Sequence, residues 1–240
     1  MFTKTAGRVP VPGATLYYEV TGRGGPVLLL IAGGGTDAAI FDGIVPQLAA
    51  QYTVVCYDPR GNSRSPYDDA PADESVSMAA EDALAVLDAI GCDVPAYVFG
   101  SSTGAITAME LLVRHPDRIR LLIAHEPPAI ELLPDATSAR AFFHEFPERM
   151  EANDEIFSTH KLLPFTSYIP DVAALVALED KFVPAVGSES SKILPAEPIL
   201  ALADRVGWDV IAFPGGHGGY ASHPFEFATL LHRVLTGALR

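Results

Sequence analysis

Cysteine and basic residues are both scarce in this sequence. Its 240 residues include two cysteines, and 16 lysines and arginines stand against 30 aspartates and glutamates, for a formal net charge of −14. Cys56 and Cys92 flank apolar stretches without the spacing of metal ligands, so no disulfide framework or zinc site is indicated and we expect two core or near-core thiols. The negative charge repels phosphate backbones and anionic membrane surfaces, which argues against a nucleic acid as partner.

Long hydrophobic runs are also missing. No stretch approaches the roughly 20 apolar residues of a membrane-spanning helix. The opening segment MFTKTAGRVPVPG has proline and glycine where a secretory signal needs an uninterrupted apolar run. We therefore expect a soluble, cytoplasmic protein with no membrane partner.

The sequence does contain enough apolar residues, 49% of the chain, for one large core. Short β-rich runs alternate with stretches of helical period, which predicts an α/β domain over residues 1–240, with a mostly parallel sheet and helices on both faces. The expected strands are residues 27–32, 53–58, 96–101, 119–125, 182–187 and 208–213. The expected helices are residues 75–90, the stretch after Thr103, 195–207 and 224–235. An antiparallel hairpin is expected at the sheet edge over residues 7–25.

Residues 127 to about 180 break this alternation, because they are aromatic, rich in proline and helical only in short pieces. We expect a short cap insertion that lies over the sheet. Its aromatic residues either line an apolar pocket or anchor the insertion to the body. These residues are Phe142, Phe143, Phe146, Phe157, Phe165 and Tyr168. Such an insertion can also form a dimer face, so a homodimer stays open.

The segment FGSSTGA, residues 99–105, follows an expected strand and precedes an expected helix. Gly100 and Gly104 bracket Ser102, which gives room for a tight turn that lifts this side chain above the sheet, so Ser102 is the candidate nucleophile. Ser101 is expected to enter the local hydrogen-bond network. The alternative is a serine and glycine turn that only caps the helix.

A serine nucleophile needs a base and a place for the developing oxyanion. His217 lies in FPGGHGGY after the last expected strand, where a flexible glycine loop can bring its ring to the same sheet edge. The backbone N–H groups of Gly34, in the GGGT segment after an earlier strand, and of Thr103 are the candidate oxyanion donors. Three glycines at a strand end can also cradle a phosphate, but the sequence GGGTDA lacks the nucleotide-binding patterns.

With GGGT, YDPRGNSRS, GSSTG and PGGHGG in this chain order, the sequence resembles the α/β-hydrolase superfamily over nearly its whole length. The resemblance implies the corresponding fold, a triad in the order serine, acid, histidine, and a structural role for Asp58 and Arg60. The GGGT segment, residues 33–36, corresponds to the oxyanion loop of the family. Many members have histidine before the first glycine of this loop, where this chain has Ala32.

The acid of the triad departs from the pattern of the family. Ser190 stands near the place where many members have aspartate. Some members instead carry the acid at the end of the next strand, after the helix that follows the nucleophile. In this chain Glu126 stands at that place. Glu126 is therefore the predicted acid and Glu189 the alternative. Pairing of Glu126 with His125 or with a surface arginine stays open.

Together these residues predict a serine hydrolase that acts on a small, largely apolar carboxylic ester or lactone, with a small-molecule substrate and no metal or organic cofactor. The same scaffold serves C–C bond hydrolysis and cofactor-free peroxide chemistry. A ligand-binding member without catalysis is a third possibility.

Overall fold

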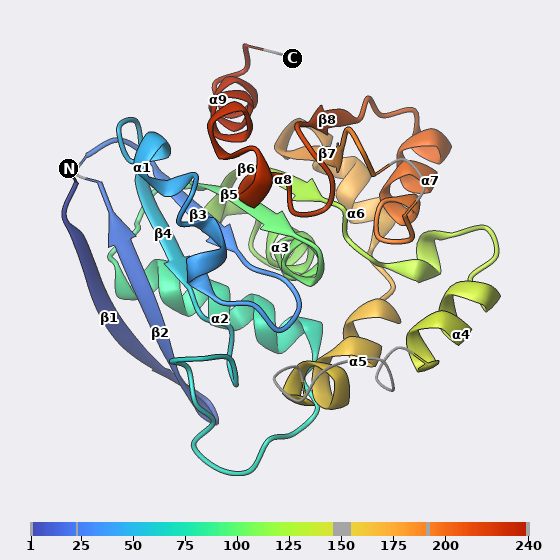
Figure 1. The fold of residues 1–240 in the computed structure, drawn as a ribbon, viewed down its shortest axis with the longest axis horizontal. Coiled ribbons are helices and arrows are strands. Elements are labelled where there is room, and N and C mark those ends of the chain that lie inside the picture. The colour runs from blue at the N-terminus through green and yellow to red at the C-terminus, as the bar shows by residue number, and fades with distance from the viewer. Residues whose placement is uncertain (1, 23, 146–154, 191–192, 239–240) are drawn as a thin grey trace.

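The computed structural model describes residues 2–22, 24–145, 155–190 and 193–238, and these residues contain an eight-stranded sheet (Figure 1). The strands lie in the order β1-β2-β4-β3-β5-β6-β7-β8. Their bounds are Lys4–Val11 (β1), Ala14–Thr21 (β2), Val27–Ile31 (β3), Thr53–Tyr57 (β4), Ala96–Ser101 (β5), Ile119–His125 (β6), Phe182–Gly187 (β7) and Ile211–Phe213 (β8). β2 is antiparallel to β1 and to β4, whereas all other neighbours are parallel. The predicted, mostly parallel α/β sheet is confirmed.

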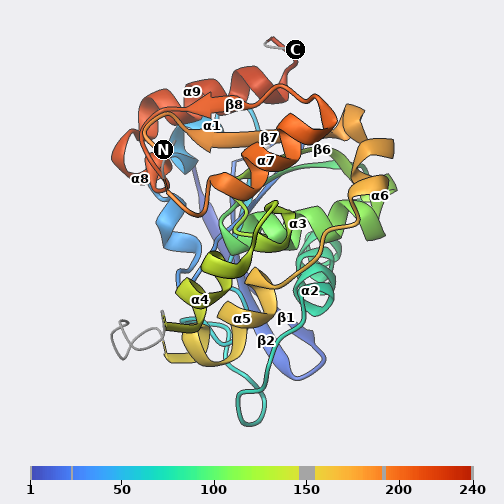
Figure 2. The same ribbon diagram turned by 90° about the vertical axis from the view of Figure 1, so that its right-hand side faces the viewer.

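Helices cover both faces of this sheet (Figure 2). In β3, Leu29 and Ile31 join the core cluster that contains α2, α3 and α7, whereas Leu28 and Leu30 join the cluster on the other face, with α1 and α9. Successive side chains of a strand point to opposite faces, so an unbroken apolar run is what a doubly covered strand requires. The helices are Val45–Leu48 (α1), Val76–Ala89 (α2), Thr103–Arg114 (α3), Glu197–Val206 (α7), Gly219–Ser222 (α8) and Pro224–Leu235 (α9).

The last strand is shorter than predicted. Residues 208–210 lie outside β8, because the N–H groups of Gly207 and Trp208 both donate to the Ala203 carbonyl and close the end of α7, with Gly207 in the left-handed conformation (φ 78°). The Trp208 ring then packs on Phe182, with 5.1 Å between ring centroids. Trp208 therefore packs beside the sheet, although the composition of its segment is typical of a strand.

Residues 127–180 form short helical segments, and 146–154 with Phe146 lie outside the described residues. The segments are Ile130–Leu132 (η3), Thr137–Glu145 (α4), Phe157–Lys161 (η6), Leu162–Thr166 (α5), Val172–Ala177 (α6) and Glu179–Lys181 (η7). Figures 1 and 2 show α4 and α5 together, away from the strands. Phe143 and Phe157 pack in a small cluster of their own, whereas Phe165 joins the main core and the Tyr168 hydroxyl donates to Glu110 (2.6 Å). The last two side chains attach the insertion to the body.

Both cysteines are free and buried, as predicted. In the described part of the chain, no helix combines the length and the apolar character that crossing a membrane requires.

Candidate active site

Ser102 stands on a strained turn between β5 and α3. Its backbone has φ 57° and ψ −129°, a conformation that is costly for a residue with a side chain. A Cβ on Gly100 would come within 2.7 Å of the Ala105 Cα, and one on Gly104 within 2.6 Å of the Ala32 carbonyl oxygen. The two glycines are therefore needed to seat the start of α3 against the sheet. The Ser102 N–H donates to the His125 carbonyl at 2.9 Å, which ties the turn to β6.

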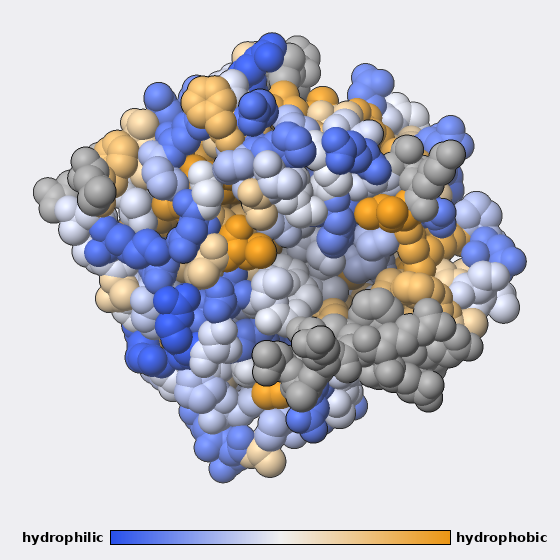
Figure 3. Space-filling view, viewed as in Figure 1, coloured by the Kyte–Doolittle hydropathy of each residue, from blue (hydrophilic) through white to orange (hydrophobic). Residues whose placement is uncertain are grey.

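The two serines of the turn have different surroundings. Ser101 is fully buried, and its Oγ lies 3.3 Å from His125 Nδ1. Ser102 is half-buried, and within the described residues its Oγ has no hydrogen bond. A free, partly exposed hydroxyl at the start of a helix suits a reacting group better than a structural one. In the view of Figure 1, the surface has a hollow right of its centre, with hydrophobic side chains along the right-hand rim (Figure 3).

Glu126 follows β6 directly and pairs with His217. Its Oε2 lies 2.5 Å from His217 Nδ1, and its Oε1 accepts from the Gly187 N–H at 2.7 Å. The backbone φ of Glu126 is 50°, and its N–H donates to the Ala185 carbonyl at 3.0 Å. This left-handed turn at the strand end directs the carboxylate across the end of β7 toward the histidine loop.

Electrostatics keep this carboxylate charged. The Glu126 side chain is fully buried, and burial alone raises its pKa. The hydrogen bonds from His217 and from the Gly187 N–H act against burial, and the net pKa of Glu126 lies below the ordinary value. Glu126 is thus a carboxylate at neutral pH, and it accepts a hydrogen bond from the Nδ1–H group of His217.

The alternative acid lies elsewhere. Glu189 is exposed, and in the described chain its carboxylate takes part in no hydrogen bond or ion pair. Ser190, which stands near the family's usual acid position, is fully buried and its Oγ has no hydrogen-bond partner among the described residues. Of the two predicted acids, the structure brings only Glu126 to the histidine.

His217 reaches the site on a loop that packs against the end of β7. A Cβ on Gly187 would come within 2.7 Å of the Gly215 carbonyl oxygen, and Gly215 itself has φ 80°. Glycine at both positions lets two backbones approach closely. The imidazole side chain is 34% exposed, so its Nε2 edge can be reached from solvent.

His125 does not pair with Glu126 but supports the histidine ring. The His125 and His217 rings are stacked, with 6.3 Å between centroids. Burial lowers the pKa of His125 to about 4, so this ring is neutral near pH 7. Its Nε2 is buried without a hydrogen-bond partner in the described residues. The ring therefore acts as a packing surface under His217.

The glycine loop after β3 lies against the nucleophile turn. A Cβ on Gly33 would come within 2.6 Å of the Ser102 Cβ. Gly34 has φ 59°, and its N–H donates to Thr103 Oγ1 at 2.9 Å. The Thr103 N–H is one of the first N–H groups of α3, which have no partner within the helix. Both predicted oxyanion donors thus belong to segments that meet at Ser102, and the Gly34 N–H donates to the Thr103 hydroxyl.

Asn62, which no sequence pattern singled out, holds this loop from the other side. The Asn62 side chain is buried, and its Nδ2 donates to the carbonyls of Thr36 (2.6 Å) and Gly34 (3.4 Å). It belongs to the YDPRGNSRS segment, in which the family resemblance implies a structural role for Asp58 and Arg60 alone. The motif was the available signal, but the partner loop lies 26 to 28 positions away.

Asp58 and Arg60 have contacts that fit a structural role. Asp58 is fully buried and accepts hydrogen bonds from the Ala38 N–H (3.0 Å) and from Arg64 Nε (2.7 Å). Arg60 donates from Nε and Nη2 to both carboxylate oxygens of Asp82, at 2.7 and 2.6 Å. These bonds fix the segment that carries Asn62.

The described residues hold no group of three or more histidine, cysteine, aspartate or glutamate side chains arranged to bind a metal ion.

Comparisons with known proteins agree with this architecture. The model of the alpha/beta hydrolase fold family matches residues 26–167. The uncharacterized hydrolase YraK of Bacillus subtilis is 34% identical over 260 residues, covering 95% of each chain. Zearalenone hydrolase of Bionectria ochroleuca is 30% identical over 258 residues, covering 94% of this chain and 96% of that enzyme.

Among solved structures, the enol-lactonase of Burkholderia xenovorans LB400 has the same fold, with a TM-score of 0.74 and 19% sequence identity. The match covers 96% of this chain and 100% of the enol-lactonase chain. The sheet order, the family match and the relatives lead to one conclusion: this chain belongs to the alpha/beta hydrolase fold family.

Proposed function

We propose that this protein is a serine hydrolase that cleaves a small, largely apolar carboxylic ester or lactone, with Ser102 as nucleophile, His217 as base and Glu126 as the acid. The observation that carries the proposal is the 2.5 Å contact between Glu126 Oε2 and His217 Nδ1, at the sheet edge where Ser102 stands on its strained turn. The names of two similar proteins, a zearalenone hydrolase and an enol-lactonase, support hydrolysis and, in the second case, a lactone substrate.

The proton on the imidazole decides how His217 works in this proposal. A carboxylate only accepts hydrogen bonds, so the contact with Glu126 puts a proton on Nδ1 and leaves the Nε2 lone pair free. Nε2 then takes the Ser102 proton as Oγ attacks the carbonyl carbon. The charged imidazole is stabilised by Glu126, which stays ionised throughout.

The remaining steps use backbone donors and water. The N–H groups of Gly34 and Thr103 hold the oxyanion, aided by the positive end of the α3 dipole. His217 returns its proton to the leaving alcohol oxygen, which in a lactone stays attached to the acyl group. Water then attacks the acyl-enzyme and loses a proton to His217. His217 passes this proton to Ser102 Oγ as the acyl C–Oγ bond breaks, and the acid is released with Ser102 and His217 restored.

Turnover of defined substrates tests this proposal. We expect wild-type protein to hydrolyse short p-nitrophenyl esters or simple γ- and δ-lactones, and Ser102→Ala to lose this activity while it keeps its melting temperature. A preference for long acyl chains would contradict the small substrate. A folded wild type that turns over neither class would move the search to C–C bonds, peroxide chemistry or plain ligand binding.

A further inference from the structure

The oxyanion loop is glycine-rich and needs outside support. Its Gly34 has both backbone polar groups engaged by side chains: the N–H by Thr103 Oγ1 (2.9 Å) and the carbonyl by Asn62 Nδ2 (3.4 Å). The same amide holds the Thr36 carbonyl at 2.6 Å. Ala32, which precedes the loop, offers only a methyl group. The position of the Gly34 donor therefore depends on Asn62 from one side and Thr103 from the other.

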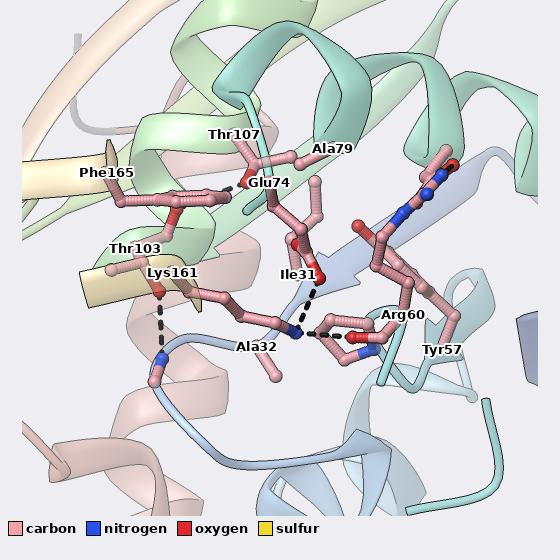
Figure 4. A pocket seen from close by; sticks show the side chains of 13 residues that line it. Ile31, Ala32, Tyr57, Arg60, Glu74, Ala79, Thr103, Thr107, Lys161 and Phe165 are labelled. Carbon is pink, nitrogen blue, oxygen red and sulfur yellow. Dashed lines mark hydrogen bonds and ion pairs between the residues drawn. The ribbon is translucent and has the colours of Figure 1, made fainter. Parts of the chain in front are cut away.

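Asn62 is itself held by a lysine from the insertion. Lys161, the last residue of η6, donates from Nζ to Asn62 Oδ1 at 2.8 Å. Its Nζ also donates to the Arg60 carbonyl and forms an ion pair with Glu74 at 3.2 Å (Figure 4). With Oδ1 bonded to an ammonium group, the amide can direct only its N–H₂ group to the loop. Lys161 therefore fixes which way Asn62 faces.

Lys161 acts inside the protein rather than on a substrate. Its side chain is 5% exposed and Glu74 opposite it is 3% exposed. The cavity that these two residues line with Thr103 and Gly34 has a volume of about 20 Å³, room for one water molecule. The Tyr67 hydroxyl donates a 2.5 Å hydrogen bond to the Glu74 carboxylate.

We propose that Asn62 and Lys161 are positioning residues that hold the Gly34 N–H in place for the oxyanion, so that the seating of the insertion sets the catalytic rate. This inference rests on the proposed function. Donors that are fixed before the reaction stabilise a developing oxyanion without reorganisation, whereas a loose glycine loop must first be ordered. The contribution is made in the transition state, so its loss lowers kcat and leaves KM nearly unchanged.

Asn62→Asp is the sharpest substitution. It keeps an oxygen for Lys161 but replaces the two N–H donors with a second oxygen, which faces the carbonyls of Gly34 and Thr36. Lys161→Met removes the ammonium group at similar length. Because it leaves Glu74 buried without its partner, the double variant Lys161→Met/Glu74→Gln is measured beside it. Lys181→Met is the matched control, since Lys181 Nζ also donates to a backbone carbonyl, that of Pro116 at 2.8 Å.

The experiment measures kcat and KM for a p-nitrophenyl ester, per active site titrated with a fluorophosphonate at Ser102. We expect kcat to fall about 10- to 100-fold in Asn62→Asp and in both Lys161 variants, with KM within about threefold and no change in Lys181→Met. Asn62→Asp combined with Lys161→Met should be no slower than Asn62→Asp alone, because both changes act on one loop.

Two failures are separable. A wild type that reacts with neither ester nor fluorophosphonate refutes the proposed function, and this inference with it. A wild type that reacts normally, with variants whose melting temperatures fall but whose kcat per titrated site is unchanged, leaves the function standing and overturns the role of Asn62 and Lys161.

Discussion

The nucleophile turn and the oxyanion loop lie side by side, but they are held in different ways. The Ser102 turn is shaped by its own neighbours, because Gly100 and Gly104 permit the packing and the Ser102 N–H bonds to the adjacent strand. The oxyanion loop is bonded to Thr103 at its Gly34 N–H, and its Gly34 and Thr36 carbonyls accept from Asn62, whose side chain is bonded in turn to Lys161 from the insertion. A short motif therefore encodes the first region, whereas only the folded chain assembles the second.

The largest expected effect comes from the nucleophile on the locally encoded turn and from the base that faces it. Ser102→Ala and His217→Ala should each lower kcat/KM by about 10⁴-fold or more, because they remove the nucleophile or its base. The double variant should be hardly slower than either single one, since the two residues act as a unit. Steady-state ester hydrolysis with purified, folded variants checks this, and additive losses would argue against a shared mechanism.

The acid should come next. Glu126→Gln keeps the acceptor for the Gly187 N–H but loses the charge at His217, and we expect kcat to fall about 10³- to 10⁴-fold. Glu189→Gln is the control and should be indistinguishable from wild type, because its side chain is exposed. If Glu189→Gln were the slower variant, the assignment of the acid would be wrong.

Glycine-to-alanine substitutions in the nucleophile turn and in the oxyanion loop should lower the unfolding free energy by different amounts. Gly104→Ala should cost about 3 kcal/mol of unfolding free energy, since its Cβ would lie 2.6 Å from the Ala32 carbonyl oxygen and backbone cannot move aside easily. Gly34→Ala should cost only about 1 kcal/mol, because its Cβ meets nothing within 4 Å and only the positive φ is unfavourable. Urea unfolding measures both, and equal costs would remove the distinction.

A pH-dependent effect on stability is expected from His125, the ring stacked on His217. The pKa of His125 is about 4 in the folded protein, against 6.5 for an ordinary histidine. Between these two pH values His125 is therefore protonated in the unfolded chain and neutral in the folded chain. Stability from this group is complete above pH 6.5 and is lost as pH falls toward 4.

Between pH 7.5 and pH 5.0 the His125 contribution amounts to about 2 kcal/mol. Wild type should therefore lose about that much more unfolding free energy over this interval than His125→Leu, as measured by urea unfolding at both pH values. Parallel losses in the two proteins would mean that His125 is not held neutral.

Much of this account can be read from the sequence. Periodicity predicts the strands and helices, because a sheet covered on both faces needs unbroken apolar runs, and the motifs point to Ser102 and His217. The start of β8 is predicted too early, because the N–H groups of Gly207 and Trp208 bond to the Ala203 carbonyl at the end of α7 and keep Trp208 out of the strand. The partner of Glu126 stays open because a single backbone angle, φ 50° at Glu126, decides where the carboxylate points.

Contacts between distant segments are what the sequence conceals. Lys161 reads as an ordinary helical lysine, and nothing near it in the chain indicates that its ammonium group meets Asn62, 99 positions earlier. Burial of this charge depends on Glu74, Arg60 and Asn62 coming together from other parts of the chain.

The central claim is that Glu126 orients His217, which activates Ser102. The rate of fluorophosphonate labelling, with the modified peptide mapped by mass spectrometry, tests it most directly in wild type, Glu126→Gln and His217→Ala. We expect a single adduct on Ser102, formed much more slowly in Glu126→Gln and not detectably in His217→Ala. An adduct at the same rate in all three proteins, or none on folded wild type, would contradict it.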